Sequence, residues 1–182
     1  MRVVSGNLRG MKLNTIEGDS TRPTRDIVKE ALFSIIQTYV PEAIFLDLFA
    51  GSGAIGIEAI SRGAKEAIFI DTNPKCVEVI KENVTKGKIV DCSRIYNTDY
   101  KTALKKLQGE IIDIIYVDPP YNKNMGIDAI LKISEYNLLA EEGLIIIETD
   151  TNEEVPEENG RYVKFNYKRY GRNILSMYRR KE

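Results

Sequence analysis

The sequence predicts an α/β fold, with a mostly parallel seven-stranded sheet, an antiparallel C-terminal edge hairpin and a small N-terminal basic arm. From residue 43 onward, short apolar segments alternate with amphipathic ones, which is the pattern of strand–helix units in a parallel sheet. The apolar segments are nearly continuous runs of β-branched residues, as in 111–117, and such strands are buried on both faces. Only a short turn around Gly171 separates the last two apolar segments, so we expect them to pair antiparallel.

The expected elements follow in chain order. Residues 2–13 form a small basic hairpin around 6–10, and 24–39 form an amphipathic helix. The apolar face of this helix is expected to contain Ile27, Ala31, Leu32, Ile35 and Ile36. The expected strands are 44–48, 67–71, 94–97, 111–117, 144–148, 161–167 and 173–178, and the expected helices between them are 54–62, 74–86, 100–107 and 127–136. The acidic stretch 149–160 is expected to be a flexible loop without a function of its own.

A chain of 182 residues has the length of one domain. We expect a single domain over 1–182, with 1–40 as the basic arm and first helix and 41–182 as the core that holds the sheet. A hydrophobic content of 43% and a charged content of 29% are typical of a globular protein and exclude a disordered chain or a membrane span. The first six residues lack the apolar run of a secretory signal, so a cytoplasmic protein is expected.

The sequence contains no histidine, which excludes several catalytic classes. Ser–His and Cys–His nucleophilic catalysis both need this residue, and a zinc site would lack nitrogen ligands. The two cysteines, Cys76 and Cys92, have no metal-binding spacing and are expected to be reduced thiols. The chemistry therefore depends on carboxylates, the backbone and a cofactor, and no metal is expected.

The net charge of −1 is distributed unevenly along the chain. Residues 1–30 carry a net charge of +2 and residues 161–182 carry +7, so the middle of the chain carries −10. Such an asymmetry favours a phosphate-binding surface beside a cofactor site, although a merely solvated basic tail has the same composition.

Glycines lie where the first expected strand ends and a helix begins. Gly51, Ser52, Gly53 and Gly56 fit G-x-G-x-x-G, in which glycines let the backbone turn sharply and approach a ligand. The pattern suits a dinucleotide as well as other nucleosides, and a tight turn without a ligand has the same appearance. The residues around the loop must therefore decide between these interpretations.

Three aspartates near this loop favour a positively charged nucleoside cofactor. Asp71 ends the second strand, where a carboxylate accepts both ribose hydroxyls of an adenosine. Asp47 would repel a pyrophosphate but attract a positively charged amino acid moiety, so S-adenosylmethionine fits better than NAD. Asp99 either accepts a hydrogen bond from the adenine amino group or caps the helix that follows it. The expected cofactor-binding residues are Asp47, Phe49, Gly51, Ser52, Gly53, Asp71, Asn73 and Asp99.

The fourth expected strand ends in the candidate catalytic residues Asp118, Pro119, Pro120 and Tyr121. An amino nitrogen conjugated to a ring is a poor nucleophile, and two acceptors aimed at its hydrogens free its lone pair. Asp118 and the carbonyl of Pro119 supply these acceptors, and the prolines hold the backbone without a competing N–H donor. Tyr121 offers a flat face on which an extruded base stacks. The alternative is a rigid turn with an aromatic residue in the core.

Segments 47–53 and 118–121 together resemble the Rossmann-like S-adenosylmethionine-dependent methyltransferases that act on amino groups. Segments 2–13 and 22–33 are similar to the arm and first helix of the RsmD-type bacterial 16S rRNA (guanine-N2)-methyltransferases, and the resemblance runs essentially from end to end. It implies methylation of the exocyclic N2 of a guanine in 16S rRNA, within a partly assembled small ribosomal subunit. The chain departs from this family at Tyr121, where many relatives carry phenylalanine, and after Gly171, where an acidic residue and a threonine are more usual.

RNA phosphates are expected to contact basic side chains near both ends of the chain, and the protein is expected to be a monomer. These side chains are Arg2, Arg9, Lys12, Arg22, Arg25, Lys168, Arg169 and Arg172. A rival is a DNA adenine methyltransferase, but 182 residues leave no room for a sizeable target-recognition insert. A protein glutamine methyltransferase is another, although such enzymes usually carry asparagine at the position of Asp118. Outside this class, the glycine loop alone supports an NAD-linked oxidoreductase, and a non-catalytic RNA-binding assembly factor would keep the same fold.

Overall fold

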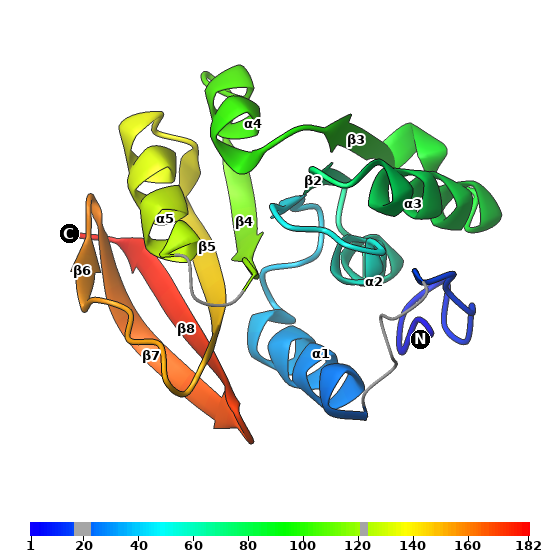
Figure 1. Ribbon diagram of the computed structural model, residues 1–182, viewed down its shortest axis with the longest axis horizontal. Helices are drawn as coiled ribbons and strands as arrows, with labels where there is room; N and C mark the ends of the chain where they lie inside the picture. Colours follow the sequence, from blue (N-terminus) through cyan, green and yellow to red (C-terminus); the bar gives the residue numbers. More distant parts are fainter. Residues whose placement is uncertain (17–22, 121–123) are drawn as a thin grey trace.

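One sheet with helices on both faces forms the centre of the computed structural model (Figure 1). The structure describes residues 1–16, 23–120 and 124–182, and of residues 23–25 it describes the backbone alone. Within these residues the sheet has eight strands in the order β3-β2-β1-β4-β5-β8-β7-β6. The predicted α/β fold, mostly parallel with an antiparallel C-terminal edge, is confirmed.

The elements have the following bounds. The strands are β1 Ile44–Asp47, β2 Glu66–Asp71, β3 Ser93–Asn97, β4 Ile112–Val117, β5 Leu139–Asp150, β6 Glu158–Asn159, β7 Tyr162–Tyr170 and β8 Asn173–Arg180. The helices are α1 Pro23–Ile36, α2 Ala54–Ser61, α3 Pro74–Lys86, α4 Tyr100–Lys106 and α5 Met125–Glu135, with a short 3₁₀ turn, η1, at Val90–Cys92. In the described part of the chain, no helix combines the length and the apolar character needed to cross a membrane.

The strand order changes direction between β1 and β4. β2 and β3 lie on one side of β1, β4 and β5 lie on the other, and these five strands are parallel. β8 then pairs antiparallel with β5, and β7 pairs antiparallel with β8. In open α/β sheets, ligands bind outside the carboxyl ends of the strands where the order changes. The ends of β1 and β4 are that place in this sheet.

Both faces of the central strands are buried, which explains why their sequences lack a polar alternation. Phe45 and Ile114 belong to a cluster with α1, while the next residues, Leu46 and Ile115, belong to a cluster with α4 and α5. All four side chains are 0% exposed. Side chains of α2 and α3 pack together on the α1 side of the sheet. The prediction of strands buried on both faces is confirmed.

Two details of the prediction are wrong. Segment 149–160 is not a loop throughout, because β5 continues to Asp150 and Glu158–Asn159 form β6, which pairs with β7. The sheet therefore has one strand more than the expected seven, since two residues are too few to show a periodic pattern. Ile27 is 57% exposed, and Val28 is buried instead. The buried face of α1 is thus rotated by one residue from the expected face.

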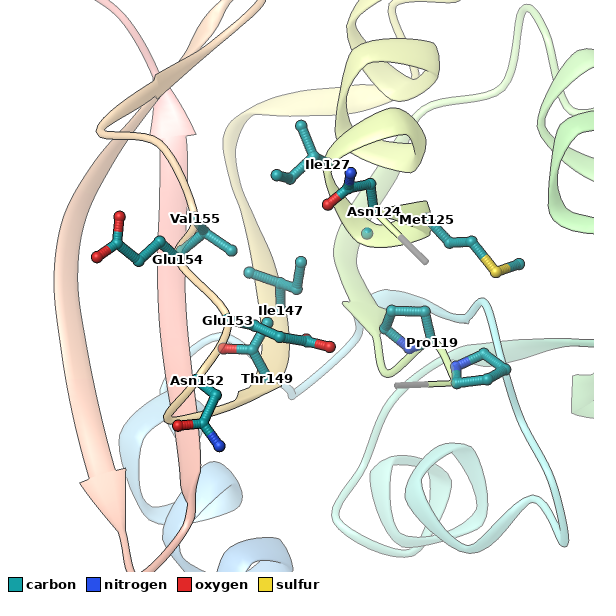
Figure 2. Close-up of a pocket in the computed structure, with 12 residues that line it drawn as sticks. Pro119, Asn124, Met125, Ile127, Ile147, Thr149, Asn152, Glu153, Glu154 and Val155 are labelled. Carbon is teal, nitrogen blue, oxygen red and sulfur yellow. The ribbon is translucent and has the colours of Figure 1, made fainter. Parts of the chain in front are cut away.

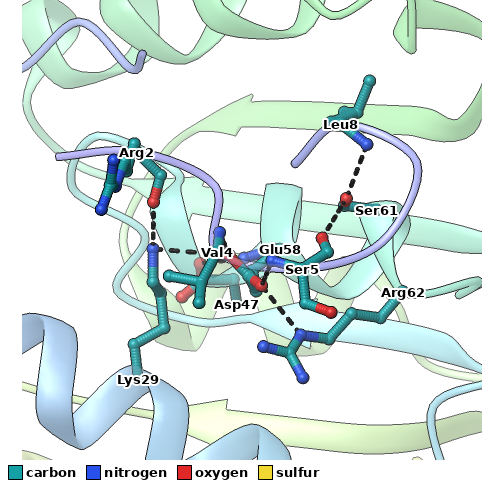
Figure 3. A network of polar contacts seen from close by, with 10 residues as sticks. Arg2, Val4, Ser5, Leu8, Lys29, Asp47, Glu58, Ser61 and Arg62 are labelled. Carbon is teal, nitrogen blue, oxygen red and sulfur yellow. Dashed lines mark hydrogen bonds and ion pairs between the residues drawn. The ribbon is translucent and has the colours of Figure 1, made fainter. Parts of the chain in front are cut away.

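The N-terminal arm, residues 1–16, docks on α2 through a buried carboxylate (Figure 3). Glu58 of α2 is 0% exposed, and its two oxygens accept the amide hydrogens of Val4 and Ser5 at 2.9 and 3.0 Å. Lys29 of α1 is 2% exposed, lies 3.4 Å from the same carboxylate and donates to the carbonyl of Arg2 at 2.6 Å. The arm, α1 and α2 therefore meet at one buried ionic cluster.

Further contacts hold the arm along its length. The arm is a hairpin, as predicted, with an antiparallel bridge between residues 2 and 12. The Ser61 hydroxyl of α2 accepts the Leu8 amide hydrogen at 2.9 Å. Asn83 of α3 is 0% exposed and donates to the carbonyls of Asn14 at 3.0 Å and Ser52 at 3.1 Å. Through Asn83, the end of the arm and the glycine loop share one hydrogen-bonding partner.

Candidate active site

The glycine loop, residues 48–53, connects β1 with α2 at the point where the strand order changes. Gly51 and Gly53 have φ angles of +55° and +79°, in the left-handed region that favours glycine. A Cβ added at Gly51 would meet no described atom within 4 Å, so the backbone there is open to a ligand. Gly53 is the N-cap of α2, so the first backbone amides of that helix follow directly after the loop.

Asp47, at the end of β1, supports this loop from within the protein. Its side chain is 1% exposed, and Oδ2 accepts the Gly56 amide hydrogen at 3.1 Å. Burial raises the pKa of this carboxyl from 3.8 to about 7; the Gly56 hydrogen bond opposes the rise and the charge of Asp71 adds to it. A carboxylate in such surroundings gains from a positive charge beside it. Its contact with the amino acid moiety of a cofactor stays a prediction.

Asp71 connects the glycine loop with the next helix. One of its oxygens accepts the Gly51 amide hydrogen at 2.8 Å, and the other accepts the Asn73 amide hydrogen at 2.8 Å. Asn73 in turn caps α3, because its side chain accepts the Lys75 amide hydrogen at 3.0 Å. Each carboxylate oxygen has a second lone pair, so Asp71 keeps the capacity to accept ribose hydroxyls. The ribose contact stays a prediction.

Asp99 caps α4, which is the alternative that the sequence left open. Its oxygens accept hydrogen bonds from the Thr102 amide at 3.0 Å and the Thr102 hydroxyl at 2.7 Å, and these bonds lower the pKa of the carboxyl. Its contact with an adenine stays a prediction. Phe49 of the glycine loop packs against Tyr100 of α4, with ring centroids 5.5 Å apart. An aromatic contact therefore joins the loop to the first residue of α4.

The proline-containing segment at 118–121 follows β4, directly beside β1. Asp47 of β1 is the register partner of Tyr116 of β4, so this segment and the glycine loop leave neighbouring strands at the same edge of the sheet. The structure describes three of the candidate catalytic residues. Asp118 and Pro120 are exposed, and Pro119 is half-buried. Tyr121 lies outside the described residues. The structure thus brings together the two motifs that the sequence singled out.

A buried polar network lies next to this segment, and sequence reasoning missed it. Tyr116 is 3% exposed and donates its hydroxyl hydrogen to Glu148 of β5, which also accepts from the side-chain amide of Asn173 of β8. Burial, followed by the charges of Glu148 and Asp118, holds the pKa of Tyr116 well above its ordinary value. Tyr116 therefore remains a hydrogen-bond donor at any physiological pH. The sequence did contain a signal for this network: Tyr116 and Asp118 are two residues apart, and alternate residues of a strand share a face.

Sequence reasoning also missed a cavity of about 340 Å³ beside the two prolines (Figure 2). Pro119 and Pro120 line one side of it, the first turn of α5 lines a second, and the end of β5 with residues 152–155 lines a third. Thr149 is its buried polar lining residue, at 5% exposure. No local pattern reveals this cavity, because its walls come from three separate parts of the chain.

The basic residues predicted to contact RNA form two groups, one on the arm beside α2 and one on the hairpin of β7 and β8, which lie well apart (Figure 1). All the described members are exposed. Arg2, Arg9 and Lys12 lie on the arm, and Lys168, Arg169 and Arg172 lie on the β7–β8 hairpin. Arg22 lies outside the described residues, and of Arg25 only the backbone is described. The contacts of both groups with RNA stay predictions.

Comparison with known proteins gives consistent matches along the whole chain. A family model described as "Conserved hypothetical protein 95" matches residues 1–179. The putative rRNA methyltransferase YlbH of Bacillus subtilis is 38% identical over 184 residues, which cover 100% of both chains. The ribosomal RNA small subunit methyltransferase D of Haemophilus influenzae is 34% identical over 152 residues, which cover 82% of this chain and 79% of that one.

Solved structures agree with these sequence matches. A structure described as the putative methyltransferase yhhF from Escherichia coli has a TM-score of 0.88 at 30% identity. The superposition covers 99% of this chain and 97% of that chain. The similarity therefore includes the arm and the C-terminal hairpin as well as the central sheet.

Proposed function

This chain belongs to the conserved hypothetical protein 95 family, the RsmD-type methyltransferases, and from that premise we propose that it methylates the N2 amino group of a guanine in 16S rRNA. Methylation of ribosomal RNA follows from membership of this family. The N2 amino group of guanine as the target is our proposal. One observation carries the proposal: the glycine loop and the Asp118 segment leave the neighbouring strands β1 and β4 at the same edge of the sheet.

The methyl donor is S-adenosylmethionine, and the chain's own residues fit it. The backbone at Gly51 is open, as close approach by a nucleoside requires. Asp71 lies beside that glycine with acceptor capacity for ribose hydroxyls. Asp47 is a buried carboxylate with a raised pKa, which suits a cationic amino acid moiety and opposes a pyrophosphate. When bound, this cofactor supplies an electrophilic methyl group.

The residues after β4 prepare the amino group of the base. Asp118 and the Pro119 carbonyl accept its two hydrogens, which draws the nitrogen out of conjugation and frees its lone pair. Two successive prolines restrict the backbone around that carbonyl, so it is preorganised. Tyr121 stacks on the base after it leaves the RNA helix. The surplus proton of the methylated nitrogen leaves through Asp118 or to water.

The substrate is 16S rRNA in a partly assembled small subunit, and the enzyme acts on it as a cytoplasmic monomer. Basic side chains on the arm and on the β7–β8 hairpin bind phosphates on either side of the site. This arrangement supports an RNA substrate that extends well beyond one nucleotide. A small-molecule substrate would need neither basic group.

Substitution of Asp118→Ala tests the proposal. We expect methyl transfer to 16S rRNA to fall by at least about 100-fold, because one of two preorganised acceptors is lost. The Kd for S-adenosylmethionine, measured by calorimetry, stays within about twofold of wild type, since Asp118 contacts the amino group and not the donor. A matched control is Asp91→Ala, at an exposed aspartate of η1.

The same preparations test the rivals. Labelled S-adenosylmethionine is incubated with free 16S rRNA or partly assembled subunits, and the modified nucleotide is then mapped. A label on N2 of guanine supports the proposal, and a label on another base or on protein rejects it. Full activity of the Asp118→Ala protein would reject the assigned mechanism, and binding of NAD in place of S-adenosylmethionine would reject the reaction class.

A further inference from the structure

The side chain of Asn83, near the end of α3, joins the N-terminal arm to the glycine loop. It is 0% exposed. Its amide nitrogen donates to the carbonyls of Asn14 at 3.0 Å and Ser52 at 3.1 Å, and its oxygen accepts the Asn14 amide hydrogen at 2.8 Å. Both hydrogens of the side-chain amide are therefore used, one on each segment. One buried side chain thus connects two segments that lie far apart in the sequence.

The hydrogen bond from Asn83 holds one peptide group of the glycine loop. The carbonyl of this peptide belongs to Ser52, and its N–H belongs to Gly53, which donates to the Ala50 carbonyl at 2.7 Å. Gly53 has a φ of +79° and no side chain, so hydrogen bonds and not side-chain packing of its own fix the backbone there. Ser52 is 5% exposed, and loss of a partner by a buried carbonyl is unfavourable. The conformation of the loop therefore depends on Asn83.

The orientation of Asn83 depends in turn on the arm. Two of its three hydrogen bonds go to the backbone of Asn14, at the end of the arm hairpin. The same part of the arm is attached to α3 by Lys86, whose ammonium group donates to the Lys12 carbonyl at 2.6 Å. The χ2 angle of asparagine has a broad preference, so its hydrogen-bonding partners decide how the amide is turned. Displacement of the Asn14 backbone would remove two of the three bonds that orient this side chain.

We propose that Asn83 is a positioning residue that makes the affinity for S-adenosylmethionine depend on the docked arm. This inference rests on the proposed function, because it takes the glycine loop as the cofactor site. While the arm is docked, Asn83 holds the Ser52 carbonyl, and the loop keeps the conformation that the cofactor binds. When the arm moves, the amide turns to other partners and the loop adopts further conformations. The apparent Kd then rises as the fraction of molecules in the binding conformation falls.

This coupling links the cofactor site to the surface on which rRNA is expected to bind. Arg2, Arg9 and Lys12 of the arm are exposed and are predicted to contact phosphates. An RNA that holds the arm against α2 and α3 would therefore favour cofactor binding. Because coupling free energies between two binding sites are reciprocal, bound cofactor would strengthen the binding of that RNA by the same factor.

A double-mutant cycle between the arm and α3 tests the coupling. Asn14→Pro removes the amide hydrogen that the Asn83 oxygen accepts. Asn14→Ala is the matched control, since it keeps the backbone and loses only an exposed side-chain contact with Glu82. The Kd for S-adenosylmethionine is measured by calorimetry for wild type, both Asn14 variants, Asn83→Ala and the Asn14→Pro/Asn83→Ala double variant. The temperature is one at which every variant is folded.

A further control separates positioning from a general loss of stability. Leu138 is 0% exposed, and its carbonyl accepts the amide hydrogen of Ile112, the first residue of β4. It therefore lies at the amino end of the parallel strands, whereas the glycine loop follows the carboxyl end of β1. Leu138→Ala should lower the Tm, because it leaves a cavity in the core, and should leave the Kd for S-adenosylmethionine within about twofold of wild type.

We expect Asn83→Ala to raise this Kd by about threefold to tenfold, the range that loss of one hydrogen bond produces. Asn14→Pro should raise it by at least about threefold and Asn14→Ala by less than about twofold. The double variant should bind within about twofold of Asn83→Ala, since both changes act through the same bond to Ser52. Hydrogen exchange gives a second readout: the Gly53 amide should lose protection in Asn83→Ala and Asn14→Pro but not in Asn14→Ala.

The outcomes separate this inference from the proposed function. A normal Kd in Asn83→Ala, multiplicative losses in the double variant, or an equal rise in Leu138→Ala would reject the coupling alone, because wild type would still bind the cofactor. A wild-type protein that does not bind S-adenosylmethionine would reject the proposed function and this inference with it.

Discussion

In the candidate site, the carboxyl group of Asp47 is buried, and burial of its charged form destabilises the folded protein. It is 1% exposed, and burial raises its pKa from 3.8 to about 7. Between these two pH values the folded protein holds a proton that the unfolded chain has released. The contribution of this group to stability therefore falls as pH rises from about 4 to about 7, and the loss is complete above that window.

Asp47→Asn is expected to stabilise the protein and to weaken cofactor binding. At pH 8 the free energy of unfolding should rise by on the order of 2 kcal/mol, because the amide oxygen still accepts the Gly56 amide hydrogen and carries no charge. The difference in stability from wild type disappears below about pH 4, because Asp47 is then protonated in both the folded and the unfolded protein. Urea unfolding at several pH values measures this.

The functional half of this prediction has its own readout. Asp47→Asn should raise the Kd for S-adenosylmethionine by at least about tenfold, as expected for the loss of a charge–charge contact in a buried site. A variant that is less stable than wild type at pH 8 would contradict the linkage argument. One that binds the cofactor normally would contradict the assigned contact.

At the scale of elements, the N-terminal arm behaves as part of the core. Breaking a buried ion pair such as Lys29–Glu58 typically costs about 3–5 kcal/mol, whereas a surface pair such as Lys132–Glu135 contributes little. Asn83 then links the end of the arm to the carbonyl of Ser52 in the glycine loop. The arm is therefore positioned by the same helices that hold the glycine loop.

Two glycines of the arm provide a matched pair of substitutions. Both have positive φ angles, +82° at Gly6 and +87° at Gly10. A Cβ at Gly6 would lie 1.7 Å from the Ser61 carbonyl oxygen of α2, whereas a Cβ at Gly10 would meet no described atom within 4 Å. Gly6→Ala should therefore displace the arm from α2, while Gly10→Ala adds only backbone strain of about 1–3 kcal/mol.

We expect Gly6→Ala to weaken rRNA binding at least about tenfold more than Gly10→Ala does. Hydrogen exchange should show loss of protection at the amides of Val4, Ser5 and Leu8 in Gly6→Ala, since these donate to α2 side chains. Equal protection in the two variants would show that the arm tolerates the clash and that docking on α2 is less specific than the contacts indicate.

For the whole molecule, the main feature is the separation of positive charge. The basic residues of the arm lie beside α2 and those of the β7–β8 hairpin lie at the antiparallel edge of the sheet, well apart from each other (Figure 1). We expect an RNA that contacts both groups to pass across the carboxyl ends of the strands. Phosphate contacts position such an RNA but carry no information on its sequence.

The salt dependence of rRNA binding tests this arrangement. Replacing Arg9 and Lys12 with alanine should reduce the slope of log K against log salt concentration by about 2, and replacing Lys168 and Arg169 should do the same. The two effects should add in the quadruple variant, because distant sites act independently. Binding of 16S rRNA is measured by fluorescence anisotropy between about 50 and 200 mM salt.

A third pair of substitutions controls for a general effect of charge. Lys105 and Lys106 are exposed in the last turn of α4, outside both basic groups, and their replacement with alanine should leave the slope unchanged. A normal slope after loss of either basic group would show that RNA does not span the sheet.

Particular residues show how far sequence reasoning reached. The runs of β-branched residues correctly predicted strands buried on both faces. Of the two roles predicted for Asp99, the structure shows that it caps helix α4. Ile27 was placed on the buried face of α1 but is exposed, because periodicity tolerates a rotation of one residue. The acidic stretch 149–160 was read as a functionless loop, yet its first residues line the cavity beside the prolines.

The sequence by itself determined the features that depend on neighbouring residues: the glycine turn, the rigid segment after β4 and the strand–helix alternation. These are local because backbone freedom and side-chain chemistry act over a few residues. Only the tertiary structure decided the raised pKa of Asp47, the burial of the Thr149 hydroxyl without a partner among the described residues, and the separation of the two basic groups. Each of these depends on removal from water or on distance, and both arise only when segments far apart in the sequence pack against one another.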